Sequence, residues 1–184
     1  MVDWKPFEEF TKELMERQHI AGAAVAVSSN GEVTYSKGFG VRDLKTGEEV
    51  TPETIFGVAS VSKSFTAMAV TQLEDEGKLS IDDPVNEYLP ELKFKGSEDM
   101  KGITIKHLLS HTTGLPPVQR REDIQTFDEH IEFLNSLERE FLGRPGEYHS
   151  YCNDTFLLLG AIIQRLTGRL YRRHMTINIL DAIG

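Results

Sequence analysis

The chain has 184 residues, of which 29 are acidic and 20 basic, giving a net charge of −9 at pH 7. That length suits one domain that buries roughly 70% of its unfolded surface. The acidic balance and the scattered basic residues argue against a nucleic-acid partner, and no apolar run reaches the ~20 residues that span a bilayer.

Apolar residues at three- and four-residue spacing predict a first amphipathic helix, and they are Trp4, Phe7, Phe10 and Leu14. Asp3 starts this helix, and Pro6 lies in its first turn. Two β-prone runs then flank Asn30-Gly31, the strongest short-range signal for a tight hairpin. The polar stretch 42–54 predicts a loop.

The rest of the chain predicts helices almost throughout. They cover residues 60–76, closed by Gly77, then 104–110, 127–141, and a helix capped by Asn153 or Asp154 that runs to Thr167 and is closed by Gly168. Residues 82–92 are turn-rich, and one more short helical segment ends the chain. Because two strands cannot make a stable sheet unaided, part of the β layer is missing.

Ser60 and Lys63 stand three apart in an apolar, small-residue run, which places both side chains on one helix face. A serine hydroxyl becomes a nucleophile when a neighbouring base takes its proton. No acidic residue lies within one turn of Lys63, so its surroundings fit a substrate better than a surface ion pair. The alternative is a plain helix cap at Ser60 with a solvated Lys63, because this short motif also arises by chance.

A second pair, Tyr151 and Asn153, lies two apart in a loop, so both side chains can point the same way. A tyrosine hydroxyl near a lysine can relay a proton, and an asparagine amide can bind a substrate carbonyl or hold the lysine. The alternative is a buried tyrosine followed by an asparagine that only caps a helix.

Three blocks in order resemble the class C β-lactamase family of penicillin-recognising serine hydrolases: "FGVASVSKSFTAMAV", "ITIKHLLSHTTGLP" and "PGEYHSYCNDTFLLLG". The resemblance covers the chain from about residue 5. It implies that Ser60 is the nucleophile, Lys63 its base or proton shuttle, Tyr151 an activator of Ser60 or proton donor to the leaving group, and Asn153 a contact to substrate and Lys63. Cys152 stands where the family often has a small polar residue, and we expect its side chain to point away.

The family's third motif, Lys-Thr-Gly or His-x-Gly, belongs on a strand after the Tyr-x-Asn block. "KTG" at Lys45–Gly47 comes too early and predicts a turn, and "HTTG" at His111–Gly114 predicts structural support. We assign neither a catalytic role. The missing strand also carries half of the oxyanion hole, and losing one such donor lowers the rate by about 10²–10³.

The resemblance therefore implies an α+β, β-lactamase/transpeptidase-like fold, with a helical part and an amino-terminal hairpin but without the carboxyl-terminal strands. Residues 1–184 would form a single, incomplete domain. The expected function is acyl transfer through a Ser60 ester on a β-lactam, a D-amino-acid peptide or a small ester. The alternatives are a binding or sensor module without turnover and an inactive truncated fragment.

We expect a small-molecule or peptide substrate, no cofactor and no metal, because the six histidines show no ligand spacing. The open hairpin edge invites a partner strand from another copy or a complementary fragment. The amino terminus lacks the layout of a signal peptide. If Met1 is the natural start, the protein is cytoplasmic, whereas an exported chain trimmed of its leader would look the same.

Overall fold

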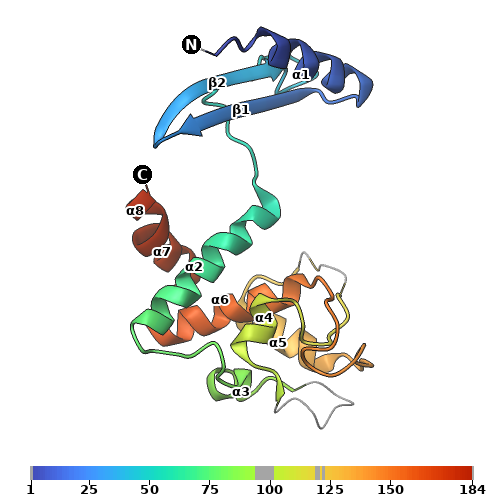
Figure 1. Ribbon diagram of the computed structural model, residues 1–184. Helices are drawn as coiled ribbons and strands as arrows, with labels where there is room; N and C mark the ends of the chain where they lie inside the picture. Colours follow the sequence, from blue (N-terminus) through green and yellow to red (C-terminus); the bar gives the residue numbers. More distant parts are fainter. Residues whose placement is uncertain (1, 94–101, 119–120, 122, 184) are drawn as a thin grey trace. The chain divides into compact units, whose positions relative to one another are not determined.

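The computed structural model describes residues 2–93, 102–118, 121 and 123–183. The chain divides into two compact units, Met1–Gly57 and Val58–Gly184. The first is a helix with a β-hairpin, and the second is a group of helices (Figure 1). The single domain expected for the whole chain stays a prediction.

The amino-terminal unit contains helix α1 (Lys5–Arg17) and strands β1 (Gly22–Ser29) and β2 (Glu32–Gly40). Between the strands, Asn30 and Gly31 have φ values of 52° and 82°. Left-handed backbone at both central residues is what a type I′ hairpin turn requires, and Asn-Gly adopts it readily. The predicted first helix and hairpin are confirmed.

The two strands form an antiparallel sheet whose register pairs Gly22 with Gly40 and Ser29 with Glu32, with a bulge after Val27. This is a two-stranded sheet in the part of the chain that the structure describes. A sheet of this size has two unpaired edges and depends on other contacts for its stability.

Aromatic contacts attach α1 to the hairpin. The Tyr35 ring of β2 lies 4.6 Å from the Trp4 ring and 5.8 Å from the Phe7 ring, measured between centroids. Glu8 of α1 also pairs with Lys37 of β2 at 2.5 Å. Two residues of the predicted apolar face, Trp4 and Phe7, therefore pack against β2, whereas Phe10 of that face is 57% exposed.

The segment "KTG" forms a turn, as its polar surroundings predict. Asp43 Oδ1 accepts hydrogen bonds from the backbone N–H of Lys45 at 2.6 Å and of Thr46 at 3.2 Å. Gly47 follows with φ of 74°, and an aspartate bonded to its own following backbone is typical of a tight turn.

The second unit is helical. Its elements are η1 (Ala59–Val61, 3₁₀), α2 (Ser62–Asp75), α3 (Val85–Tyr88), α4 (Ile105–Leu109), α5 (Phe127–Ser136), α6 (Asn153–Thr167), α7 (Tyr171–Met175), the π-helical η3 (Thr176–Leu180) and α8 (Asp181–Ile183). The glycine stops predicted for two helices are confirmed, because Gly77 and Gly168 follow α2 and α6 with φ of 68° and 64°.

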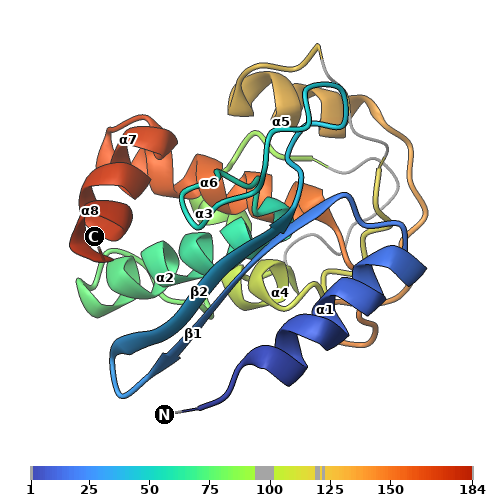
Figure 2. The ribbon, with the colours of Figure 1, turned by 90° about the horizontal axis from the view of Figure 1, so that it is seen from above.

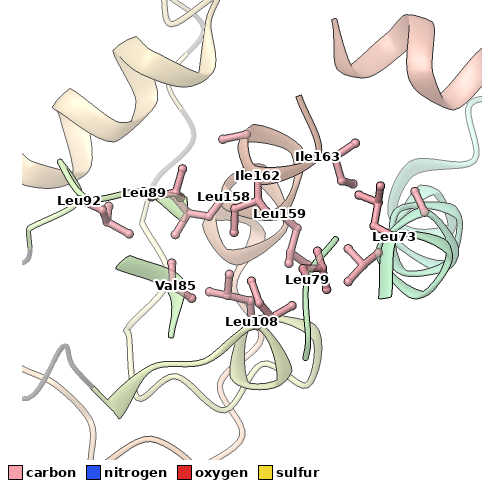
Figure 3. Close-up of a cluster of buried hydrophobic side chains, with 14 of the residues drawn as sticks. Leu73, Leu79, Val85, Leu89, Leu92, Leu108, Leu158, Leu159, Ile162 and Ile163 are labelled. Carbon is pink, nitrogen blue, oxygen red and sulfur yellow. The ribbon is translucent and has the colours of Figure 1, made fainter. Parts of the chain in front are cut away.

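Helix α6 forms the centre of the core of this unit. Its large buried apolar side chains (Figure 3) are Leu158, Leu159, Ile162 and Ile163. Around them lie apolar side chains from other elements, including Leu73 of α2, Val85 of α3 and Leu108 of α4. Helix α2 runs beside α6 (Figure 2), so the core fixes the position of one against the other.

Two sequence predictions for this unit were wrong. The helix predicted over 127–141 ends at Ser136, because Leu137 adopts extended backbone with ψ of 135°. The Ser136 hydroxyl donates to the Phe133 carbonyl at 2.7 Å, a local bond that competes with helix continuation. The stretch read as turns also contains one helical turn, Val85–Tyr88, after Pro84, and the Tyr88 hydroxyl bonds Asp83 Oδ2 at 2.5 Å beside it.

Thr126 caps α5, and its removal gives a first testable result. Its hydroxyl accepts from the Glu129 N–H at 3.2 Å, while the Glu129 carboxylate accepts from the Thr126 N–H at 2.9 Å. Replacing such a cap by alanine costs about 1 kcal/mol. We expect Thr126→Ala to lower the free energy of unfolding in urea by that amount, while Thr126→Ser keeps most of it. Equal stability of the two variants would contradict the capping role.

Candidate active site

Ser60 lies in the 3₁₀ turn η1, which leads directly into α2. The preceding residue, Ala59, has φ of 44°, a left-handed conformation that costs an alanine about 1–2 kcal/mol. Strained backbone of this kind clusters at functional sites, where the surrounding structure enforces it. The expected position of Ser60, at the start of a helix, is confirmed.

Lys63 lies one helical turn after Ser60 and reaches back to it. Its Nζ is 3.2 Å from Ser60 Oγ and 2.7 Å from Asn153 Oδ1. These contacts are incompatible with the alternative of a lysine that extends freely into solvent. The core contact between α2 and α6 brings the two residues together, since Asn153 is the first residue of α6.

Tyr151 approaches Ser60 from the other side. Its hydroxyl lies 2.6 Å from Ser60 Oγ. Cys152 between Tyr151 and Asn153 is extended, with φ of −138° and ψ of 123°, so the flanking side chains share one side and the cysteine points to the other. The structure thus brings together all four residues singled out in the sequence.

The Cys152 side chain is fully buried, as its predicted direction requires. Its Sγ lies 3.2 Å from Asp154 Oδ2, and Asp154 in turn pairs with His130 Nε2 at 3.2 Å. Burial raises the pKa of Asp154, but the contacts with His130 and Cys152 outweigh it and leave that pKa below its usual range. This polar cluster anchors the Tyr151–Asn153 loop from beneath.

The expectation that Asn153 or Asp154 caps α6 was wrong. The cap position is Cys152, and its side chain makes no capping bond. The Asn153 side chain bonds Lys63, and the Asp154 carboxylate bonds Cys152 and His130. Both side chains that could have capped the helix have partners in or under the site, which sequence spacing alone does not reveal.

Lys63 also shapes the electrostatics of Tyr151. Its Nζ lies 4.7 Å from the centroid of the Tyr151 ring and 5.6 Å from that of Phe156, within the range of cation–π attraction. The hydrogen bond with Lys63, and then that with Ser60, lowers the pKa of the Tyr151 phenol. A phenol with a lowered pKa loses its proton more readily, so a larger fraction is phenolate and available as a base near neutral pH.

His111 is the neighbour whose closeness to the site the sequence did not indicate. The segment 111–114 was interpreted as support, and its backbone does bond the loop that carries Tyr151: Ser150 N–H donates to the His111 carbonyl at 2.8 Å, and Gly146 N–H donates to the Thr112 carbonyl at 2.7 Å. The centroid of the His111 imidazole ring, however, also lies 4.6 Å from the centroid of the Tyr151 ring. The short "HTTG" motif was the signal that could have found this contact.

Within residues 2–93, 102–118, 121 and 123–183, no group of three or more His, Cys, Asp or Glu side chains is arranged to hold a metal ion. Over the same residues, no helix has both the length and the apolar character needed to cross a membrane.

Comparison with known proteins gives one family match, to the family described as Beta-lactamase, over residues 7–184. A curated relative, the teichoic acid D-alanine hydrolase of Staphylococcus aureus, is 32% identical over 160 residues, which are 87% of this chain and 38% of that protein.

Solved structures agree with this match. An octameric penicillin-binding protein homologue from Pyrococcus abyssi superposes with a TM-score of 0.88 at 33% identity, covering 100% of this chain and 43% of that one. A class C β-lactamase superposes with a TM-score of 0.82 at 29% identity, covering 96% and 48%. The chain thus spans less than half the length of each protein it matches here.

Proposed function

Because the chain belongs to the beta-lactamase family, we propose that Ser60 is the nucleophile of a serine hydrolase that works by acyl transfer. The observation that carries the proposal is the position of Ser60 Oγ, which lies 3.2 Å from Lys63 Nζ and 2.6 Å from the Tyr151 hydroxyl. A serine with two proton-carrying groups at hydrogen-bonding distance can lose its proton as it attacks and return it to a leaving group.

In the proposed reaction, Ser60 Oγ attacks the carbonyl carbon of an amide or ester while its proton passes to Lys63 or Tyr151. The bond between that carbon and the leaving nitrogen or oxygen then breaks, and Tyr151 or Lys63 returns the proton to the leaving group. Water afterwards hydrolyses the Ser60 ester and regenerates the serine. Asn153 holds Lys63 through Oδ1 at 2.7 Å and leaves its amide N–H₂ to meet a substrate carbonyl.

The proposed substrates are those expected from the sequence: a β-lactam, a D-amino-acid peptide or a small ester. A name such as teichoic acid D-alanine hydrolase describes the relative, and it supports D-alanyl esters as one compound class to test here. The octameric state named for the Pyrococcus homologue likewise supports self-association, with the open hairpin edges as one route. Since the chain spans less than half the length of these relatives, its activity, substrate and assembly are proposals.

Covalent labelling tests the proposal. We expect a fluorophosphonate or a fluorescent penicillin to add one adduct to the folded chain, mapped to Ser60 by peptide mass spectrometry, and Ser60→Ala to abolish it. Ser62→Ala is the matched control, because Ser62 lies two residues away at the start of α2. Absence of an adduct on folded chain would contradict acylation by these 184 residues, and a penicillin adduct that never turns over would favour the binding or sensor module instead.

A further inference from the structure

His111 lies in the turn after α4 and touches the Tyr151–Asn153 loop through both its backbone and its ring. Its φ is 57°, a left-handed conformation that is uncommon outside glycine, although asparagine, aspartate and histidine adopt it more often than other residues. Among the described non-glycine residues, four have positive φ, and two of them, Ala59 and His111, adjoin Ser60 and Tyr151.

Three contacts of His111 bracket Tyr151. The His111 carbonyl accepts from the N–H of Ser150, the residue before Tyr151, at 2.8 Å. Its Nδ1 accepts from the N–H of Cys152, the residue after Tyr151, at 3.3 Å. Its ring packs 4.6 Å from the Tyr151 ring and 5.1 Å from the Phe156 ring. One residue thus fixes the backbone on both sides of Tyr151 and the face of its phenol.

The hydrogen bond from Cys152 specifies the protonation state of the imidazole. A backbone N–H can only donate, so His111 Nδ1 carries a lone pair and its proton lies on Nε2. Protonation of Nδ1 would set its N–H against that of Cys152 in a buried place, because His111 is 9% exposed and Cys152 fully buried. The proton would then point to Thr155 Oγ1, which also lies 3.3 Å from Nδ1, and the Cys152 N–H would lose its acceptor. The contact that holds the residue after Tyr151 exists only while the imidazole is neutral.

The groups that face His111 also oppose its protonation. The Lys63 cation points toward the same aromatic faces, Tyr151 and Phe156, and the His149 ring lies 5.9 Å away. Two further titratable groups lie near His111, namely the phenol of Tyr151 and the buried thiol of Cys152. Burial lowers the pKa of His111, and the charges of Lys63 and His149 lower it further, whereas the smaller effect of the backbone hydrogen bond with Cys152 raises it.

We propose that His111 is a positioning residue, which as a neutral imidazole holds the Tyr151 hydroxyl against Ser60, and that protonation of His111 releases the Tyr151–Asn153 loop and switches acylation off. This inference rests on the proposed function and adds to it the residue that controls its acid limit. In the same step the Tyr151 phenol loses its contact with the His111 ring, and the loop loses the hydrogen bond from the Cys152 N–H to His111 Nδ1. The Tyr151 hydroxyl then no longer lies at hydrogen-bonding distance from Ser60 Oγ.

Two variants separate positioning from simple packing. Asparagine tolerates positive φ, and its Oδ1 can accept from the Cys152 N–H, but it does not titrate. Leucine fills similar space and accepts no hydrogen bond. We expect His111→Asn to lower the rate of Ser60 labelling at pH 8 by about 3- to 10-fold, because ring packing is lost. We expect His111→Leu to lower that rate by about tenfold more, because a buried N–H is left unpaired.

The dependence of the Ser60 labelling rate on pH distinguishes the two roles, because a purely structural role of His111 would not change it. The second-order rate of Ser60 labelling by a fluorophosphonate is measured from pH 5 to 8, and the ¹⁵N shifts of His111 follow its protonation in the same samples. We expect the wild-type rate to fall as His111 gains its second proton and His111→Asn to lose that acid limb. The comparison variant His149→Gln should keep an acid limb but shift it to higher pH, because the charge of His149 lowers the pKa of His111. An unchanged acid limb in His111→Asn would overturn the proposal, as would wild-type rates in His111→Leu.

A failure of the proposed function gives a different result. If wild-type chain forms no adduct, acylation by this chain fails, and the positioning role is tested by the Tyr151 ring resonances. We expect these resonances to shift together with His111 protonation in wild type and to stay constant over that pH range in His111→Asn. Tyr151 resonances that ignore His111 protonation in wild type would overturn the inference.

Discussion

Replacing Lys63 by alanine lowers the rate at which Ser60 is labelled by about 10²- to 10⁴-fold, the usual contribution of a positioned general acid or base. The change removes the Nζ that lies 3.2 Å from Ser60 Oγ and 2.7 Å from Asn153 Oδ1. It also removes the hydrogen bond and charge that lower the pKa of Tyr151, so that pKa returns toward its ordinary value and less of the phenol is deprotonated and available as a base at neutral pH. The rate is measured by fluorophosphonate labelling at pH 7 to 8.

The fold of this variant should remain, because Lys63 contributes no side chain to the hydrophobic core. Circular dichroism and the urea midpoint check that point. Lys106→Ala is the matched control, since Lys106 is also a helical lysine and its side chain is 64% exposed. A Lys63→Ala chain that labels at the wild-type rate would remove Lys63 from the mechanism.

Lys63→Arg separates the two roles that a lysine can have here. Arginine keeps the positive charge near Tyr151 but cannot release a proton at working pH. A rate close to that of Lys63→Ala indicates that Lys63 itself carries the Ser60 proton. A rate close to wild type indicates that the cation acts by holding Asn153 and tuning Tyr151.

Replacing Gly114 by alanine should lower the free energy of unfolding by about 2–5 kcal/mol. Gly114 has φ of 79°, and an added Cβ would lie 2.2 Å from the Gly143 carbonyl oxygen. The left-handed backbone alone costs an alanine about 1–2 kcal/mol, and the overlap adds a term of the order of 1–3 kcal/mol found for overpacked sites. Urea unfolding measures the loss.

Gly77→Ala separates the two terms. Gly77 has nearly the same backbone, with φ of 68°, but an added Cβ there meets nothing within 4 Å. We expect it to lose only the backbone part, about 1–2 kcal/mol. Because the Gly114 carbonyl also accepts from the Leu142 N–H at 2.8 Å, Gly114→Ala should in addition slow Ser60 labelling more than Gly77→Ala does. Equal stability of the two variants would rule out the overlap with Gly143.

The parts of the fold that could be predicted from the sequence are those with a local physical cause. Asn30-Gly31 determines a hairpin turn, and Gly77 and Gly168 end helices, because each needs backbone angles that few residues adopt. The family and the fold class, taken from three ordered motif blocks, are confirmed by the comparisons. Ser60, Lys63, Tyr151 and Asn153 meet as expected, although their roles in catalysis stay proposals.

The features missed were those set by tertiary contacts. Nothing in an alanine predicts positive φ, so the strain at Ala59 follows only from how η1 joins α2. His111 is 40 residues from Tyr151 in sequence, and its ring contact depends on α4 and α6 packing in one core. The Asn153 side chain could have capped α6, but Lys63 competes for it.

Because Cys152 lies in the Tyr151–Asn153 loop, the reactivity of the chain's single thiol reports how often that loop opens. Burial, and then Asp154, raises the pKa of this thiol to about 12, and only a thiolate reacts readily with disulfide reagents. Because the thiol sits between Tyr151 and Asn153 with no exposed surface, a reagent can reach it only when that loop lifts. The rate of thiol exchange in native conditions therefore reports how often the Tyr151 loop departs, without any substrate and without a mutation in the site.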